Sequence, residues 1–282
     1  MEYVTLANDV NVPLIGFGVY QIPANETCES SVSNAIKAGY RLIDTAAVYG
    51  NEKEVGAAIK KSGVPRNELF IVTKCWVQDF GYESTKKAFQ KSLENLGLEY
   101  IDLYLLHQAF GDYYGAWRAV EELYEAGKIK SIGVSNFFPD RLTDLCLNCR
   151  IKPMVNQVEL HPFFQQNNAL ETMKEFNVVP MAWGPLDEGK RNIFSHPVLS
   201  AIGKKYGKTC AQVALRWNVQ RGVIIIPKSV HNERIVENFN ILDFKLDDDD
   251  NAEISKLDIG HSEIIEHHDP ATVKMIHSVR IH

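Results

Sequence analysis

The chain has 282 residues, of which 45% are hydrophobic, so it is long enough for one α/β barrel or two ordinary domains. Its 30 Lys and Arg residues and 36 Asp and Glu residues leave a net charge of −6, which argues against nucleic acid as the main partner. It contains no apolar run long enough to span a membrane, and its five cysteines without a secretion signal indicate free thiols in the cytoplasm.

The N-terminal half is predicted to form a β-hairpin and then four units, each an apolar strand followed by an amphipathic helix. The hairpin joins Tyr3–Leu6 to Val10–Val12 through a polar turn. The four strands are predicted at Leu14–Tyr20, Tyr40–Thr45, Leu69–Lys74 and Ile101–His107. The four helices are predicted at Glu26–Ala38, Glu52–Lys61, Ser84–Leu96 and Gly115–Ala126.

The same alternation continues in the C-terminal half. Strands are predicted at Ile129–Val134, Met154–Val158, Val178–Trp183 and Gly222–Ile226. Helices are predicted at Pro139–Leu147, Ala169–Asn177, Pro197–Tyr206, Cys210–Val219, Glu233–Asn240 and Ala252–Leu257. The acidic run Asp247–Asp250 is expected to begin the last helix, because negative charge favours a helix N-terminus. The histidine-rich stretch Ile259–His282 has no clear pattern and suggests an open pocket.

Eight strands followed by helices predict a (β/α)₈ TIM barrel that forms one domain over residues 1–282, with the hairpin closing the bottom of the barrel. The alternative is a doubly wound open sheet, which would need a glycine-rich dinucleotide fingerprint at its first turn. Gly16 and Gly18 lack the third glycine, and Pro23 interrupts any helix that could open there. The barrel is therefore favoured, and functional residues are expected at the C-terminal ends of its strands.

An acid, a phenol, an amine and an imidazole follow three successive strands. Asp44 lies at the end of the second predicted strand and Tyr49 in the loop after it, while Lys74 and His107 end the third and fourth strands. A carboxylate at the end of a buried strand is costly unless something pairs with it. Taken singly, each of these residues is more often structural, but at one end of a barrel they form a proton-transfer set.

Four stretches of the chain together resemble the aldo-keto reductase superfamily. They are DTAAVYGNE at 44–52, LLH at 105–107, GVSNF at 133–137, and IPKS at 226–229 with Arg234, Glu237 and Asn238. The resemblance covers nearly the whole chain and implies an NAD(P)H-dependent carbonyl reductase on a (β/α)₈ barrel. The chain is most similar to the short prokaryotic-type members, such as 2,5-diketo-D-gluconate reductases and glyoxal reductase-like enzymes, which implies a cytoplasmic monomer without a metal.

The resemblance also implies a role for each member of the proton-transfer set. Tyr49 would protonate the carbonyl oxygen while the cofactor supplies a hydride to the carbon. The ammonium of Lys74 would favour the phenolate and lower the pKa of Tyr49, and Asp44 would hold Lys74 and keep it protonated. His107 would donate a hydrogen bond to the carbonyl oxygen and fix its orientation.

The same resemblance assigns a site for NADPH or NADP⁺. Ser135, Asn136 and Gln157 would bind the nicotinamide carboxamide, and Trp183 would stack on the nicotinamide ring. The adenosine end, with the phosphate on its ribose, would be held by Lys228, Ser229, Arg234, Glu237 and Asn238. Two cations around one phosphate favour NADPH over NADH.

The substrate is expected to be a small carbonyl compound. Tyr20, Trp76 and Trp183 are expected to line the barrel mouth beside His107, and aromatic walls with few charges suit an uncharged or weakly polar ligand. Two positions depart from the family pattern, because many relatives have Ser in place of Gly184 and many close relatives have Pro in place of Ala109.

Other functions remain open on the sequence. The chain could be a cofactor-binding regulatory subunit on the same barrel without significant turnover, or an isomerase or aldolase that uses Lys74 as a Schiff-base amine. Cys146 and Cys149 form a C-x-x-C pair, which could be redox-active or half of a metal site. The simpler interpretation is two thiols on or near a packed helix face.

Overall fold

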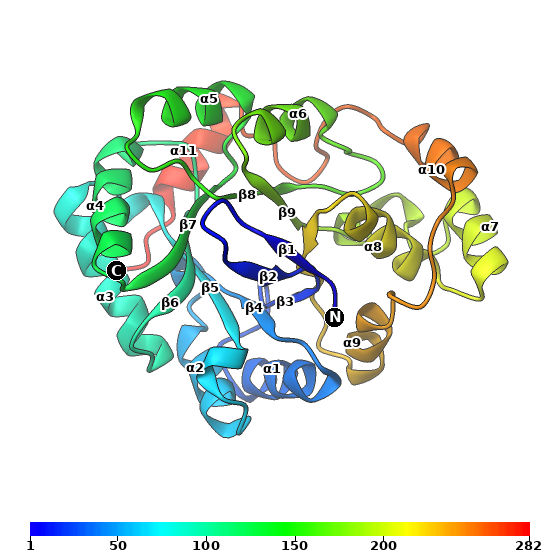
Figure 1. Cartoon of the computed structure of the whole chain (residues 1–282), viewed down its shortest axis with the longest axis horizontal. Helices are drawn as coiled ribbons and strands as arrows, with labels where there is room; N and C mark the ends of the chain where they lie inside the picture. The colour runs from blue at the N-terminus through cyan, green and yellow to red at the C-terminus, as the bar shows by residue number, and fades with distance from the viewer.

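In the computed structural model, which describes all 282 residues, eight parallel strands form a barrel at the centre of the molecule (Figure 1). Each strand pairs with the next one along the chain. The strands are β3 (Gly16–Gly18), β4 (Leu42–Asp44), β5 (Phe70–Cys75), β6 (Ile101–Leu106), β7 (Ile129–Ser135), β8 (Val155–Glu159), β9 (Val179–Trp183) and β10 (Ile224–Ile225). The prediction of a (β/α)₈ barrel is confirmed.

The barrel closes between its first and last strands, β3 and β10. Ile15 and Ile225 form a single parallel bridge, and the backbone N–H of Gly18 donates to the carbonyl of Pro227 at 3.1 Å. A Cβ atom at Gly18 would lie 2.7 Å from the carbonyl oxygen of Ile226, so only glycine allows this close approach. The second glycine of the predicted first strand therefore serves the closure of the sheet.

Helices surround the barrel on its outside (Figure 1). The α-helices are α1 (Glu26–Ala38), α2 (Glu52–Lys61), α3 (Tyr82–Leu96), α4 (Tyr113–Glu125), α5 (Pro139–Asn148), α6 (Asn167–Glu175), α7 (Pro197–Tyr206), α8 (Cys210–Gln220), α9 (Asn232–Phe239), α10 (Asp248–Ser255) and α11 (Pro270–Ser278). The 3₁₀ turns are η1 (Ala47–Tyr49), η2 (Arg66–Glu68), η3 (Val77–Asp79) and η4 (Asp187–Asn192). No helix is long and apolar enough to cross a membrane.

Side-chain caps determine where several helices begin. Asn25 accepts a hydrogen bond from the backbone of Thr27 at the start of α1. Asp247 and Asp250 cap each other's backbone N–H groups at the start of α10. The acidic run therefore begins this helix, as predicted, although α10 starts at Asp248 and not at the predicted Ala252.

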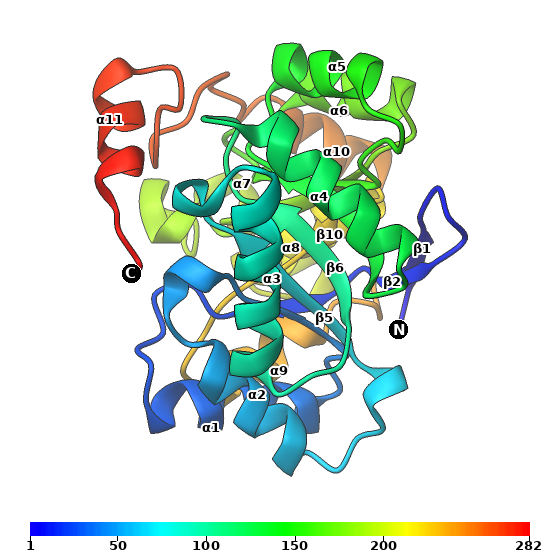
Figure 2. The ribbon, with the colours of Figure 1, turned by 90° about the vertical axis from the view of Figure 1, so that its left-hand side faces the viewer.

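The N-terminal hairpin covers one end of the barrel. Strands β1 (Tyr3–Thr5) and β2 (Asn11–Pro13) pair antiparallel, with Val4 opposite Val12. Asn8, in the turn, donates from Nδ2 to the carbonyl of Lys130 near the start of β7, at 2.9 Å. The hairpin thus lies at the N-terminal ends of the strands, away from α11 at the other end (Figure 2).

A single cluster of 69 buried hydrophobic residues forms the core and extends along the chain from Leu6 to Ile254. Strands β5, β6 and β8 are buried at every residue, as expected for parallel strands with helices outside them and packed side chains inside the barrel. Such strands are continuous apolar runs, which is why the sequence located them.

The C-terminal segment differs most from the prediction. Helix α11 begins at Pro270, where Asp269 accepts a hydrogen bond from the backbone of Ala271, and it buries only Ile276. A helix without a repeating apolar stripe gives little signal in a sequence. Trp76 Nε1 donates to the carbonyl of Val279 at 3.0 Å, so the end of the segment packs against Trp76 at the C-terminal end of the barrel.

Candidate active site

Three neighbouring strands bring the predicted proton-transfer residues together. Asp44 is the last residue of β4, Lys74 is the last residue but one of β5, and His107 follows β6 directly. Tyr49 ends η1, the turn after β4. The ring centroids of Tyr49 and His107 are 5.7 Å apart, and Lys74 Nζ lies 5.0 Å from the Tyr49 centroid. These four residues therefore form one cluster at the C-terminal ends of the strands.

The fully buried ammonium of Lys74 has three hydrogen-bond acceptors around it. Its Nζ donates to Asp44 Oδ1 at 2.6 Å, to the carbonyl of Thr45 at 2.9 Å and to Tyr49 Oη at 3.4 Å. An ammonium carries three hydrogens, so each one has an acceptor. The second oxygen of Asp44 accepts from Gln157 Nε2 at 2.8 Å. This complete set of partners is what allows a charged pair to be buried here.

Burial has the largest effect on the ionisation of these groups. It raises the pKa of Asp44, against the opposing charge of Lys74, and it lowers the pKa of Lys74, against the opposing charge of Asp44. Burial also raises the pKa of Tyr49 well above its ordinary value, and Asp44 and Tyr20 act in the same direction.

The expectation of a lowered pKa for Tyr49 is therefore wrong for this structure, because burial outweighs the nearby ammonium of Lys74. The phenolate would lose its hydration on burial, and Asp44 already balances the ammonium charge 3.4 Å from the phenol. The raised pKa of Tyr49 still suits a reductase, since a phenol with a raised pKa keeps its proton at neutral pH.

His107 is a neutral imidazole at the mouth of the barrel. Burial lowers its pKa well below the ordinary value, and the charges of Lys74 and His267 lower it further. Its Nδ1 is buried without a hydrogen-bond partner. A neutral imidazole still has one N–H to donate, so His107 can hydrogen-bond a carbonyl oxygen without being charged.

The predicted aromatic wall lies around this cluster. Trp76 packs edge-on against His107, with ring centroids 5.2 Å apart, and is 6% exposed. Tyr20 lies beyond the end of β3, with its ring centroid 5.0 Å from that of Tyr49, and is 53% exposed. Trp76 is therefore an inner wall and Tyr20 lies at the rim.

The residues predicted to bind the nicotinamide carboxamide contact one another. Asn136 donates from Nδ2 to the carbonyl of His107 at 3.0 Å, and its Oδ1 accepts from Trp183 Nε1 at 2.8 Å. Ser135 donates from Oγ to the carbonyl of Gln157 at 3.0 Å. These contacts place the amide groups and the indole beside the proton-transfer cluster, where a nicotinamide ring would have to lie for hydride transfer.

The two cations predicted to bind a phosphate lie after the last strand. Lys228 follows β10, and Arg234 lies in α9. Both side chains are exposed, and neither forms an ion pair with the protein. The nearby acid Glu233 lies 3.9 Å from His231 instead. Cations without a protein partner fit a phosphate-bearing ligand.

The residues predicted to contact adenine have partners within the protein. Glu237 Oε1 accepts from Thr209 Oγ1 at 2.6 Å, which joins α9 to the start of α8. Asn238 is buried. Ser229 lies at the start of the turn before α9, where its Oγ accepts from the backbone of His231 at 3.1 Å. These contacts hold α9, which carries Arg234, and the turn before it, which follows Lys228.

Known proteins share both this sequence and this barrel. The sequence profile described as the Aldo/keto reductase family matches residues 14–259. The chain belongs to the aldo/keto reductase family. It is 49% identical over 259 residues to 9,11-endoperoxide prostaglandin H2 reductase of Trypanosoma cruzi, and the match covers 90% of each chain. It is 48% identical over 257 residues to glyoxal reductase of Bacillus subtilis, and that match covers 91% of this chain and 92% of the relative.

A solved member of the family shows the same architecture with a cofactor. The crystal structure of an aldo-keto reductase from Bombyx mori in complex with NADP superimposes with a TM-score of 0.88 at 32% identity. The match covers 97% of this chain and 96% of the other. The chain is therefore an oxidoreductase of this family.

The two departures from the family pattern both lie beside the site. Gly184 has a φ of +57°, and a Cβ atom there would lie 3.6 Å from Cδ1 of Ile264 in the C-terminal segment. This left-handed backbone favours glycine over serine. Ala109 is buried in the loop after β6.

The C-x-x-C pair, Cys146 and Cys149, is not activated. Both thiols are free, and burial raises their pKa values to about 12 and about 11.

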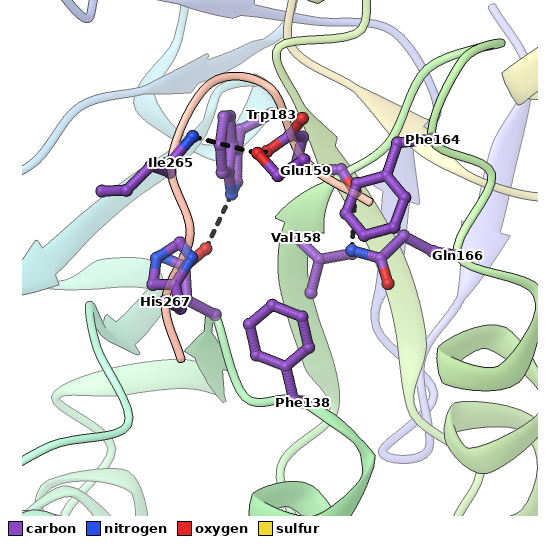
Figure 3. A pocket seen from close by; sticks show the side chains of 10 residues that line it. Phe138, Val158, Glu159, Phe164, Gln166, Trp183, Ile265 and His267 are labelled. Carbon is purple, nitrogen blue, oxygen red and sulfur yellow. Dashed lines mark hydrogen bonds between the residues drawn. The ribbon is translucent and has the colours of Figure 1, made fainter. Parts of the chain in front are cut away.

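The sequence analysis missed a small cavity beside Trp183 (Figure 3). It has a volume of about 10 Å³, which is room for about one water-sized group. Its walls include Asn136, Phe138, Glu159, Trp183, Ile265 and His267. The last two come from the C-terminal stretch, whose histidines were the only signal in the sequence. A larger groove of about 750 Å³ lies under the hairpin, at the opposite end from the proton-transfer residues.

Proposed function

We propose that this chain catalyses the NADPH-dependent reduction of small aldehydes, ketones or dicarbonyls to alcohols, with Tyr49 as the proton donor. The observation that carries the proposal is the contact set of Lys74, whose ammonium reaches Asp44, the Thr45 carbonyl and Tyr49 Oη beside His107. A purely structural lysine would need no phenol at the mouth of the barrel as its third acceptor.

Reduction of a carbonyl needs a hydride at carbon and a proton at oxygen. NADPH, when bound, supplies the hydride. Tyr49 holds the proton at Oη, and its raised pKa keeps that proton in place until the oxygen becomes basic enough to take it. Lys74 donates to the same oxygen and stabilises the phenolate that is left. His107 donates a hydrogen bond to the carbonyl oxygen and orients it toward Tyr49.

The residues present fit NADPH better than NADH. Lys228 and Arg234 would hold the phosphate on the adenosine ribose, with Ser229 at their side, because these exposed cations have no acidic partner. Asn136, Gln157 and Ser135 would bind the carboxamide, and Trp183 would stack on the ring. The complex of the Bombyx mori relative with NADP supports this choice.

Small aldehydes and vicinal dicarbonyls are the proposed substrates, in preference to sugar phosphates. Trp76 and Tyr20 provide aromatic walls beside Tyr49 and His107. Along the chain, no cluster of cations adjoins Trp76 to hold a substrate phosphate. The name of the Bacillus subtilis relative, glyoxal reductase, agrees with a dicarbonyl substrate.

The experiment is to follow NADPH oxidation with methylglyoxal and with 4-nitrobenzaldehyde, in the wild-type protein and in Tyr49→Phe. The variant keeps the ring but loses the proton, so turnover should fall by about a hundredfold or more. NADPH binding should be largely retained. A control is Tyr82→Phe, which removes a surface hydroxyl that contacts Glu122 and should keep wild-type turnover.

Two results would contradict the proposal. If Tyr49→Phe kept a tenth or more of the wild-type turnover, Tyr49 would not be the proton donor. If the wild-type protein bound NADPH but reduced no carbonyl compound, a cofactor-binding regulatory subunit would be the better description.

A further inference from the structure

Residues 262–268, here called the strap, cross the C-terminal end of the barrel beside Trp183. Ser262 donates from Oγ to Glu159 Oε2 at 2.6 Å, which ties the strap to the end of β8. The carboxylate of Glu263 accepts from Arg191 Nε at 2.6 Å and from Nη2 at 2.7 Å, which ties it to η4. Ile265 packs against the small cluster that contains Trp76. The strap is therefore held at several points over the active site.

His267 extends from this strap into the cavity beside Trp183 (Figure 3). It is 6% exposed, and its Nε2 is buried without a hydrogen-bond partner. Its ring lies 5.7 Å from that of Phe138, measured between centroids. A buried polar atom left unpaired costs free energy, and native proteins rarely keep one without a reason. A ligand atom that enters the cavity would remove this cost.

The neighbouring carboxylates are held by other partners, and neither forms a hydrogen bond with His267 in this structure. Glu159 accepts from Ser262 through Oε2, and its Oε1 lies 3.0 Å from His161 Nε2. The carboxylate of Glu266 accepts from the backbone of His268 at 2.9 Å. Burial lowers the pKa of His267 to about 4, although Glu159 and Glu266 act against this shift. The imidazole is therefore neutral at physiological pH, with one nitrogen that donates a hydrogen bond and one that accepts.

The cavity adjoins the proton-transfer residues. Asn136 lines the cavity and also donates to the carbonyl of His107 at 3.0 Å. Ile265, which also lines the cavity, packs against the cluster that contains Trp76, and the ring centroids of Trp76 and His107 are 5.2 Å apart. A carbonyl compound whose reacting oxygen binds Tyr49 and His107 would therefore lie next to this cavity.

We propose that His267 is a specificity-determining residue whose Nε2 hydrogen-bonds a second oxygen, on the carbon next to the reacting carbonyl of the substrate. The preferred substrates are then vicinal dicarbonyls and hydroxy-carbonyl compounds, in preference to simple aldehydes of the same size. This inference rests on the proposed function, because it assumes that a carbonyl is reduced at Tyr49.

The test compares two substrates that differ by one oxygen, methylglyoxal and propanal. In His267→Phe, kcat/KM for methylglyoxal should fall by about tenfold, because one hydrogen bond is lost. The value for propanal should change by less than about twofold on the same argument. Hydration of methylglyoxal in water affects wild type and variant equally, so it cancels from their ratio. His267→Gln, which keeps an N–H donor, should recover part of the preference.

A matched control is His268→Phe, the same substitution one residue further along the strap. His268 is exposed, and its Nδ1 lies 3.1 Å from Glu266. His268→Phe should keep both kcat/KM values.

Equal losses for the two substrates in His267→Phe would show that the residue only supports the strap, and this would overturn the inference. So would weakened NADPH binding, since the cavity would then serve the cofactor. No turnover of any carbonyl compound by the wild-type protein would instead refute the proposed function.

Discussion

At the scale of residues, the site depends on how the charge and the three hydrogens of the buried Lys74 ammonium find partners. Lys74 alone would be costly inside the barrel, and so would Asp44, but each provides a partner for the other at 2.6 Å. The remaining hydrogens of the ammonium reach a backbone carbonyl and the phenol of Tyr49. The same arrangement that makes the pair tolerable in the core therefore connects it to the proposed proton donor.

The cofactor preference can be tested at one residue. Arg234→Ala should weaken NADPH binding by about 1.5–3 kcal/mol, because a charge-assisted hydrogen bond to the ribose phosphate is lost. NADH binding should change little, since NADH lacks this phosphate. Titration of protein fluorescence with each cofactor measures both constants.

The control for this prediction is Arg141→Ala, which removes an exposed arginine that lies 3.7 Å from Asp140 and far along the chain from Arg234. It should affect neither cofactor. Equal losses for NADPH and NADH in Arg234→Ala would show that the guanidinium does not contact the phosphate.

At the scale of elements, the C-terminal segment and the turn after β5 hold each other in place. Trp76 donates to the carbonyl of Val279, and Gln78 Oε1 accepts from the backbone of Ile281 at 2.9 Å. Trp76 also forms the wall beside His107. The chain end and the substrate pocket therefore share one side chain, so a change in one affects the other.

Two substitutions at Trp76 should separate these roles. Trp76→Ala removes both the wall and the hydrogen bond, so KM for 4-nitrobenzaldehyde should rise and the amides after α11 should exchange faster. Trp76→Phe keeps an aromatic wall but has no N–H donor, so exchange should increase while KM changes much less. Steady-state kinetics and hydrogen–deuterium exchange measure the two effects.

NADPH affinity should be nearly unchanged in both variants, because we assign Trp76 to the substrate pocket and not to the cofactor site. If Trp76→Ala altered only cofactor binding, the assignment of this wall to the substrate pocket would be wrong.

At the scale of the whole molecule, one core supports the barrel, and groups buried as neutral species make its stability depend on pH. Burial lowers the pKa of His267 from the ordinary 6.5 to about 4. Between these two pH values, the unfolded chain binds a proton at this residue that the folded chain does not. Stability should therefore fall as the pH falls from 6.5 toward 4, with no contribution from this residue above 6.5.

This acid sensitivity should be smaller in His267→Phe, which has no group to protonate. The measurement is urea unfolding of wild type and variant at pH values of about 7 and about 5, on either side of the ordinary histidine pKa. The variant should lose less free energy of unfolding between the two pH values than the wild type. An equal loss in both proteins would show that His267 is protonated, or already accessible, in the folded state.

The sequence by itself determined the barrel and which residues would meet at the proposed proton-transfer site. Parallel strands buried on both faces are continuous apolar runs, and helices on the outside carry an apolar stripe, so both leave a local pattern. Because such strands end at the same side of a barrel, Asp44, Lys74 and His107 could be expected to meet. The motif around Tyr49 then added the phenol to this set.

Only the tertiary structure decided the strap, the cavity and the direction of the pKa of Tyr49. Helix α11 buries a single side chain, and the strap is held by contacts between distant residues, such as Ser262 with Glu159. Neither leaves a periodic pattern. The pKa of Tyr49 depends on a balance between desolvation and an ammonium already paired with Asp44. Burial and pairing come from the packed fold, so no local stretch of sequence could reveal which effect is larger.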